Sequence, residues 1–307
     1  MNKNNISIKN MIKSHLTSFK IYKINPIIFY CEVIFINFFI FKNYYSILLQ
    51  IKKKQFPINF IFRNGESINT NDLTETALLL SRCKGIKFQK DRIVINNDTY
   101  DDSIILENWK HSVSVKEIFI ENEYGSLDVK DKIVLDIGAN VGDTSILFSR
   151  LGAKKVIGLE PQLKFFNMCK KNIEINNLEK KIDIFNAGLD DTHGFFTIDE
   201  HEDSKGFALK NAEKGIKIPK KILEDIMPDD GDLILKLDCE LCEYNVILNT
   251  DKQYLQKFET IIMEFHDGNE NLIKKLSSIG FEVRILNSRW TYKKKYRGHL
   301  IAINKNI

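Results

Sequence analysis

Short hydrophobic runs alternate with amphipathic segments through the second part of the chain, from about residue 132 to its end. Runs of this kind favour buried strands, and the segments between them favour helices. We expect strands near residues 132–137, 155–159, 182–186, 233–238, 260–265, 281–286 and 299–304. Strands that alternate with helices are typical of an α/β fold with a mostly parallel sheet, and such sheets bind ligands beyond the carboxyl ends of their strands.

The pattern differs near the start of the chain, where a basic segment encloses one apolar run. Residues 1–60 contain nine lysines and a single acidic residue, Glu32, whereas the whole chain has a formal net charge of +4. The apolar run at residues 27–41 is too short to span a bilayer and contains polar residues. We favour a helical extension over residues 1–56 that packs on the rest of the protein. The alternative is a peripheral contact of residues 9–42 with an anionic membrane surface.

Two short strands follow this extension, at residues 58–63 and 92–96. They predict a small α+β lid or platform over residues 57–112, which leaves residues 113–307 for the α/β domain. A hydrophobic content of 43% and a charged content of 28% are those of an ordinary globular protein. No signal-peptide cleavage pattern follows the apolar run, so we expect a cytoplasmic protein, with attachment at a membrane surface as the alternative.

A glycine-containing turn, "VLDIGANVGDT", joins the first strand of the α/β domain to a helix. A dinucleotide site needs a second glycine where this chain has Asn140, and a P-loop needs a lysine where it has Asp143. The spacing of Gly138 and Gly142 therefore favours a ligand that contains adenosine but no diphosphate. A tight turn without a ligand is the alternative.

The next strand ends at an acidic residue, Glu160, which Pro161 follows. Glu160 lies 22 residues after Gly138, close to the offset at which a carboxylate binds ribose hydroxyls in doubly wound folds. The alternative is an acid that favours the dipole of the following helix. The two signals together favour a nucleoside site.

Charged residues gather at the predicted fourth and fifth strands. Lys236, Asp238 and Glu240 share one side of an extended chain, and Glu264 and His266 are again two residues apart. Such charges are costly to bury unless they pair or bind something, so the pattern indicates chemistry. Together, the side chains of Asp238, Glu240, Glu264 and His266 could also hold a divalent cation, but we expect no metal. A further alternative is that His266 only caps the end of its strand.

The segments "VLDIGANVGDTS", "GLEPQ", "LILKLDCELCE" and "IIMEFH" together resemble S-adenosylmethionine-dependent methyltransferases of the FkbM family, from about Ile61 to about Phe281. The resemblance implies a class I, Rossmann-like, mostly parallel seven-stranded sheet with an antiparallel last strand. It also implies S-adenosylmethionine as cofactor and methylation of a hydroxyl on a sugar, glycan, glycolipid or small metabolite. The family has glycine where this chain has Leu241, which places the local turn in question.

The resemblance also identifies candidate site residues. Asp238 or His266 is the candidate general base, and Glu240 and Lys236 orient the reacting groups. The small Ala187 and the amide of Asn186 match the position where the family approaches the adenine. The expected cofactor-binding residues are Asp136, Gly138, Ala139, Asn140, Gly142, Glu160, Pro161, Asn186, Ala187 and Tyr124.

The five cysteines do not indicate a disulfide framework in a chain of this length. Cys239 and Cys242 form the one C-x-x-C pair, and no second pair is available to complete a zinc site. We expect two thiols packed beside a buried strand.

The loop between the last two strands, residues 287–299, is basic and contains several aromatic residues. If the sixth strand is parallel to the others and the seventh is antiparallel, the loop lies at the same edge as the candidate site, where it could receive an acidic acceptor. A solvated hairpin tip is the alternative. Two rival functions are an RNA-modifying methyltransferase, which we do not favour, and a non-catalytic adaptor with a degenerate fold.

Overall fold

The computed structural model describes residues 38–39, 41–63, 65, 67–71, 76, 79, 86–88, 92–96, 102–107, 114–119, 122–125, 127–198, 215–291 and 294–307. They belong to two compact units, one drawn from residues 1–96 and 108–125, the other from residues 97–107 and 126–307. Most of the proposed membrane-contact segment lies outside the described residues. No helix among the described residues is long and apolar enough to cross a membrane.

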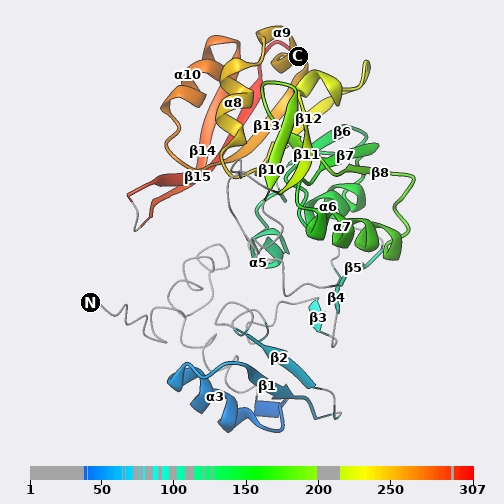
Figure 1. Cartoon of the computed structure of the whole chain (residues 1–307), viewed down its shortest axis with the longest axis vertical. Coiled ribbons are helices and arrows are strands. Elements are labelled where there is room, and N and C mark those ends of the chain that lie inside the picture. Colours follow the sequence, from blue (N-terminus) through cyan, green and yellow to red (C-terminus); the bar gives the residue numbers. More distant parts are fainter. Residues whose placement is uncertain are drawn as a thin grey trace. The chain divides into compact units, whose positions relative to one another are not determined.

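The described residues of the first unit form two helices and two antiparallel strand pairs, coloured from blue to green-cyan in Figure 1. Phe41, at the end of the apolar run, is buried, and its ring lies 5.0 Å from that of Phe60. The end of the run therefore belongs to the hydrophobic core of this unit. The elements are α3 (Tyr44–Lys53), β1 (Ile58–Ile61) paired with β2 (Ser67–Thr70), β3 (Ile86–Phe88) paired with β4 (Arg92–Ile95), and α5 (Ser114–Phe119).

A seven-stranded sheet forms the centre of the second unit (Figure 1). Its order is β14-β15-β13-β12-β6-β7-β8, and only β15 among them runs antiparallel to its neighbours. This confirms the sheet expected from the sequence. The strands are β6 (Ile133–Ile137), β7 (Lys155–Leu159), β8 (Ile182–Phe185), β12 (Leu233–Leu237), β13 (Phe258–Phe265), β14 (Phe281–Trp290) and β15 (Tyr296–Asn304).

Helices cover both faces of this sheet, as the alternation of side chains requires. Leu135 and Leu235 belong to the same hydrophobic core as Val246 of α8 and Leu272 of α10. Asp136, one residue along β6, points to the other face, where it bonds to α6. The helices are α6 (Asp143–Arg150), α7 (Leu163–Ile175), α8 (Cys242–Asn249), α9 (Lys252–Leu255) and α10 (Glu270–Ser278), and β5 (Ile104–Glu107) packs against α7.

A second, three-stranded sheet lies between β8 and β12 in the chain and was not expected from the sequence. Its strands are β9 (Gly188–Leu189), β10 (Gly194–Ile198) and β11 (Ile216–Lys221), and a short 3₁₀ helix, η3 (Leu223–Asp225), follows. The sequence "IKIPKK" of β11 carries lysines and a proline, and Phe195 of β10 is 58% exposed. Such strands give only a weak pattern because little of their surface is buried.

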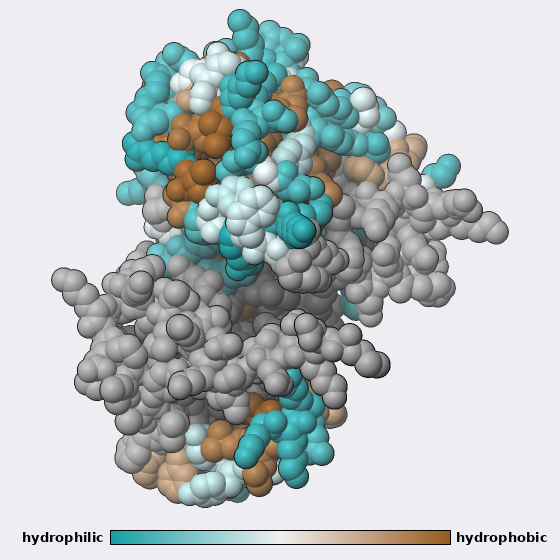
Figure 2. All heavy atoms as spheres, turned by 90° about the vertical axis from the view of Figure 1, so that its left-hand side faces the viewer, coloured by the Kyte–Doolittle hydropathy of each residue, from teal (hydrophilic) through white to brown (hydrophobic). Residues whose placement is uncertain are grey.

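The edge strand β14 is the most exposed part of the large sheet. Ile285, Leu286 and Trp290 are exposed, and the last of these is 72% accessible. Figure 2, which views the molecule from the side where this edge lies in Figure 1, shows hydrophobic patches within a mostly hydrophilic surface of the second unit. The β14–β15 turn lies at the edge of the sheet where β12 and β13 end, as the strand directions require. This confirms the predicted location of the basic loop.

Candidate active site

The glycine turn after β6 is built on backbone conformations that ordinary residues avoid. Gly138, Asn140 and Gly142 all have positive φ angles, of 81°, 48° and 86°. The N–H groups of Gly138 and Ala139 both donate to the carbonyl oxygen of Leu159, each at 3.0 Å. The turn is thereby fixed to the end of the neighbouring strand β7.

The two glycines allow close approach by other parts of the protein, a role that the sequence analysis did not foresee. A Cβ atom on Gly138 would lie 1.9 Å from the carbonyl oxygen of Asp238, and one on Gly142 would lie 2.8 Å from the sulfur of Cys169. Gly138 therefore brings the turn against the loop after β12. The cofactor candidates and the catalytic candidates consequently meet at one edge of the sheet.

A buried ion pair lies beneath the turn. Asp136 is fully buried, its Oδ2 accepts hydrogen bonds from Thr144 and Ser145 at 2.7 and 2.6 Å, and its Oδ1 lies 2.9 Å from Lys236 Nζ. Lys236 also donates to the carbonyl of Gly138 at 3.0 Å. Burial disfavours the lysine charge, but Asp136 and the more distant Asp238 outweigh this cost, so the pKa of Lys236 is raised.

Lys236 does not share one side of an extended chain with Asp238 and Glu240, as the sequence analysis expected. Strand β12 ends at Leu237, and Glu240 has a left-handed backbone, so the alternation of an extended chain does not continue through these residues. Within the strand, Lys236 points to the face of the sheet that α6 covers, where its partner is Asp136.

Glu160 is 5% exposed and is bound by main-chain donors. Its Oε2 accepts the N–H of Asn140 at 2.9 Å and its Oε1 accepts the N–H of Gln162 at 2.8 Å. Asn186 donates to the carbonyl oxygens of Glu160 and Pro161, both at 2.9 Å. Burial raises the pKa of Glu160 to about 7, although both main-chain donors and Lys236 act in the opposite direction.

These residues fit the ribose of an adenosyl group. Each carboxylate oxygen of Glu160 accepts one hydrogen bond and can accept another, so two hydroxyl donors can be bound. The buried Oδ1 of Asn140 has no hydrogen-bond partner among the described residues, which leaves a further acceptor at the turn. The small side chains of Ala139, in the glycine turn, and of Ala187, which follows Asn186, are both buried. Tyr124 is also buried, and it belongs to the first unit.

A cluster of carboxylates surrounds one imidazole beyond the ends of β12 and β13. The imidazole Nε2 of His266 lies 3.3 Å from Glu240 Oε2 and 3.5 Å from Glu264 Oε2. Ligand atoms of Asp238, Glu264 and His266 all lie within 4.8 Å of one another and could hold a metal ion. The side chain of Asp238 has no hydrogen-bond or ion-pair partner among the described residues and is partly exposed.

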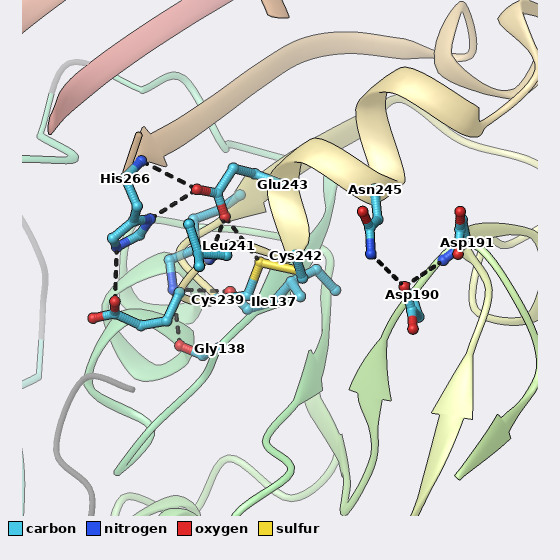
Figure 3. The surroundings of a disulfide bond; sticks show 12 residues. Ile137, Gly138, Asp190, Asp191, Cys239, Leu241, Cys242, Glu243, Asn245 and His266 are labelled. Carbon is cyan, nitrogen blue, oxygen red and sulfur yellow. Dashed lines mark hydrogen bonds and ion pairs between the residues drawn. A yellow bond between two sulfur atoms is a disulfide. The ribbon is translucent and has the colours of Figure 1, made fainter. Parts of the chain in front are cut away.

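Glu243, at the start of α8, holds this cluster in place (Figure 3). It is fully buried, and its Oε1 lies 2.8 Å from His266 Nδ1 and accepts the His266 main-chain N–H at 3.2 Å. Its Oε2 accepts the main-chain N–H of Leu241 at 2.8 Å. One carboxylate thus ties the loop after β12 to the end of β13.

The ionisation of the cluster follows from its crowding. Burial disfavours the charged form of His266, but Glu243, Glu264 and Glu240 outweigh it and raise the pKa of His266 to about 9. Burial and the charge of Asp238 raise the pKa of Glu264. Burial also raises the pKa of Glu240, against the attraction of His266 and Arg297. His266 is therefore positively charged at neutral pH, and the carboxylates repel one another.

The loop after β12 keeps a left-handed turn although it lacks the family glycine. Leu241 has a φ of 90° and Glu240 a φ of 52°, and the N–H of Leu241 is bound by Glu243. Cys239 and Cys242 form a disulfide across this turn, with Cα atoms 5.5 Å apart. The expectation of two packed thiols was wrong, because a turn that brings residues i and i+3 this close also brings their sulfur atoms together. The sulfur of Cys239 lies 3.7 Å from Glu243 Oε2 (Figure 3).

Glu243 and Arg297 had no assigned role in the sequence analysis, and Glu264 had only the alternative role of a metal ligand. Glu243 is signalled by its spacing after Glu240, and Glu264 by its spacing before His266. Arg297 lies on β15, and its Nη2 is 3.5 Å from Glu240 Oε2. Its position could not be read from the sequence because it depends on the pairing of β15 with β13.

Comparisons with known proteins agree with this geometry. The family described as methyltransferase FkbM domain matches residues 136–293. Uncharacterized protein 158B of Sulfolobus islandicus rod-shaped virus 1 is 30% identical over 159 residues, which cover 51% of this chain and 76% of that protein. Ribosomal protein L11 methyltransferase of Aquifex aeolicus is 29% identical over 140 residues, which cover 42% of this chain and 52% of that protein.

Among solved structures, the methyltransferase FkbM of Methylobacillus flagellatus is similar over 58% of this chain and 45% of that one, with 14% identity and a TM-score of 0.40. The chain thus spans about half of the L11 methyltransferase and less than half of the solved FkbM structure. The family match covers the glycine turn, Glu160 and the carboxylates and imidazole of the cluster, but not Arg297. The chain belongs to the FkbM family of S-adenosylmethionine-dependent methyltransferases.

Proposed function

We propose that the protein methylates a hydroxyl group of a sugar, glycan, glycolipid or small metabolite. The observation that carries this proposal is the partly exposed side chain of Asp238, which has no hydrogen-bond or ion-pair partner among the described residues. The main-chain carbonyl of Asp238 lies against Gly138 of the glycine turn. A hydroxyl loses its proton as its oxygen forms a new bond, and a carboxylate without a partner can accept that proton. S-adenosylmethionine supplies the methyl group when it is bound.

The ionisation of the cluster separates the roles of its members. His266 already carries a proton at neutral pH, since its pKa is raised to about 9, so it is a poor proton acceptor. We assign proton acceptance to Asp238 and give His266 the role of holding Glu240 and Glu264 in place. General-base help of this kind contributes about 10² to 10⁴ in rate. Lys236 supports the site from below through Asp136 and the carbonyl of Gly138.

The basic residues of the β14–β15 hairpin favour a negatively charged acceptor. Arg289 and Lys294 are exposed and have no ion-pair partner among the described residues, and Trp290 beside them is largely exposed. Lys295 pairs with Asp267, and Arg297 reaches Glu240, so the hairpin connects the basic surface to the cluster. We therefore expect the acceptor to carry a phosphate or carboxylate group.

A transfer assay tests the proposal. Purified protein and labelled S-adenosylmethionine are incubated with neutral sugars, acidic sugars, glycolipids, RNA and protein; protein is included because one relative is an L11 methyltransferase. We expect label on a hydroxyl of an acidic sugar or glycolipid, and a loss of about 100-fold in turnover for Asp238→Asn with unchanged cofactor binding. Label on RNA or protein alone, or equal loss of binding and turnover, contradicts the proposal. Cofactor binding without transfer to any acceptor favours a non-catalytic adaptor.

A further inference from the structure

The carboxylate–imidazole cluster has an excess of negative charge. Asp238, Glu240, Glu243 and Glu264 contribute four carboxylates, which face the imidazole of His266 and, at Glu264, the weaker attraction of His299. Arg297 approaches Glu240, and Lys236, whose ion-pair partner is Asp136, attracts Asp238 from a greater distance. A further positive charge near its centre would stabilise the charged form of this cluster, because charges removed from water are costly unless they are compensated.

The ring of His266 is aimed into this cluster. It is fully buried, and its Nδ1 is held by Glu243 at 2.8 Å. Its Nε2 is buried and has no hydrogen-bond partner among the described residues, although two carboxylates stand 3.3 and 3.5 Å away. A carboxylate that fixes one ring nitrogen while the other nitrogen faces oxygen ligands is the arrangement that metal-binding histidines adopt.

The separations within the cluster suit a single ion. Ligand atoms about 2.1 Å from an octahedral ion lie about 3 Å apart in adjacent positions and about 4.2 Å apart in opposite ones. His266 Nε2 and Glu264 Oε2 are 3.5 Å apart, and all three ligand atoms of Asp238, Glu264 and His266 lie within 4.8 Å of one another. The 3.5 Å separation exceeds that of adjacent ligands by about half an ångström, which a small side-chain movement can close.

We propose that Asp238, Glu264 and His266 bind one divalent metal ion, contrary to the expectation from the sequence. Two carboxylates and an imidazole suit Mn²⁺ or another first-row ion better than Mg²⁺, which prefers oxygen alone. The imidazole gives up its proton to solvent as the ion binds, because only its neutral form is a ligand. The role of the ion rests on the proposed function: it would lower the pKa of an acceptor hydroxyl beside Asp238.

Direct binding tests this proposal without reference to methyl transfer. Full-length protein is freed of metal with a chelator and titrated with Mn²⁺, and free Mn²⁺ is followed by electron paramagnetic resonance. We expect one site per chain, with Kd raised at least tenfold by Glu264→Gln and by Asp238→Asn. The matched control is Glu259→Gln, which removes one charge from the same strand outside the cluster and should leave Kd unchanged. Thermal unfolding verifies that each variant is folded.

Two outcomes overturn the proposal. They are absence of Mn²⁺ binding by folded wild-type protein, and binding that Glu264→Gln and Asp238→Asn weaken no more than Glu259→Gln does. The transfer assay distinguishes this failure from failure of the proposed function. Mn²⁺ binding at the cluster without methylation of any hydroxyl retains the metal site and rejects the function. Hydroxyl methylation by protein that binds no Mn²⁺ retains the function and rejects the metal site.

Discussion

The candidate site has two halves, the glycine turn with the ion pair beneath it and the carboxylate–imidazole cluster, and they differ in how completely their charges are paired. Under the glycine turn, Asp136 Oδ2 accepts hydrogen bonds from Thr144 and Ser145, and its Oδ1 forms an ion pair with Lys236. Beyond β12 and β13, several carboxylates share His266, and Asp238 has no partner among the described residues. The charges of the first half are paired within the protein, and those of the second half leave room for compensation by a metal ion or a substrate.

The contrast teaches that burial of charge alone does not mark the reactive part of this protein. Lys236 was expected to orient the reacting groups, but its contacts belong to the scaffold. Glu264 and Asp238, which are partly exposed, lie where compensation is incomplete. Removal of one charge should therefore destabilise the first half and leave the second half equally stable or more so.

The largest effect should follow from breaking the buried pair. Lys236→Met leaves Asp136 as an unpaired buried carboxylate and should lower the free energy of unfolding by about 3 to 5 kcal/mol. Glu264→Gln should change it by less than about 1 kcal/mol, because it relieves repulsion. Urea unfolding of both variants provides the measurement. Adding Asp136→Asn to Lys236→Met should restore part of the lost stability. Equal destabilisation by Lys236→Met and Glu264→Gln would show that the two halves do not differ in this way.

The pH dependence of stability tests whether burial raises the pKa of Glu160. Its pKa rises from 4.5 to about 7 on folding, so its protonated form is favoured by the folded state. The stability it contributes is fully present below pH 4.5 and is lost as the pH rises to about 7, by at most about 3 kcal/mol. Unfolding free energies of wild type and Glu160→Gln should therefore diverge over this window, with wild type becoming relatively less stable. A difference that stays constant from pH 4.5 to 8 contradicts the burial argument.

Reduction of the Cys239–Cys242 disulfide should lower the free energy of unfolding by less than Lys236→Met does. A cross-link that closes a loop of this length contributes about 2 kcal/mol in the chain-entropy account. A phosphine reductant should lower the free energy of unfolding of wild-type protein by about that amount. The variant that carries both Cys239→Ser and Cys242→Ser is the control and should not respond. If both proteins respond equally, the effect comes from other cysteines.

The smallest effect concerns Leu241. A leucine with positive φ is strained, and glycine removes that strain while it raises the entropy of the unfolded chain. Leu241→Gly should therefore stabilise the protein by up to about 1 kcal/mol, measured as a rise in Tm. A fall in Tm shows instead that packing of the leucine side chain outweighs its backbone strain.

Much of the fold could be predicted from the sequence because the large sheet is buried on both faces. Strands such as β7 and β12 carry short apolar runs bounded by turns, and their bounds lie within a residue or two of the expected ones. The small sheet could not be predicted, since β10 and β11 expose much of their surface. The ion pair of Asp136 with Lys236 depends on strand order, which no single segment specifies.

Calorimetry with S-adenosylhomocysteine tests the central claim, that Glu160 and the glycine turn bind the cofactor while the carboxylate–imidazole cluster acts on the acceptor. Wild-type protein should bind the ligand at one site per chain. Glu160→Gln should weaken binding by about tenfold or more, because it removes hydrogen bonds to a charged acceptor. Asp238→Asn should bind as wild type does. Absence of binding to folded wild-type protein, or equal affinities for wild type and Glu160→Gln, would contradict the account.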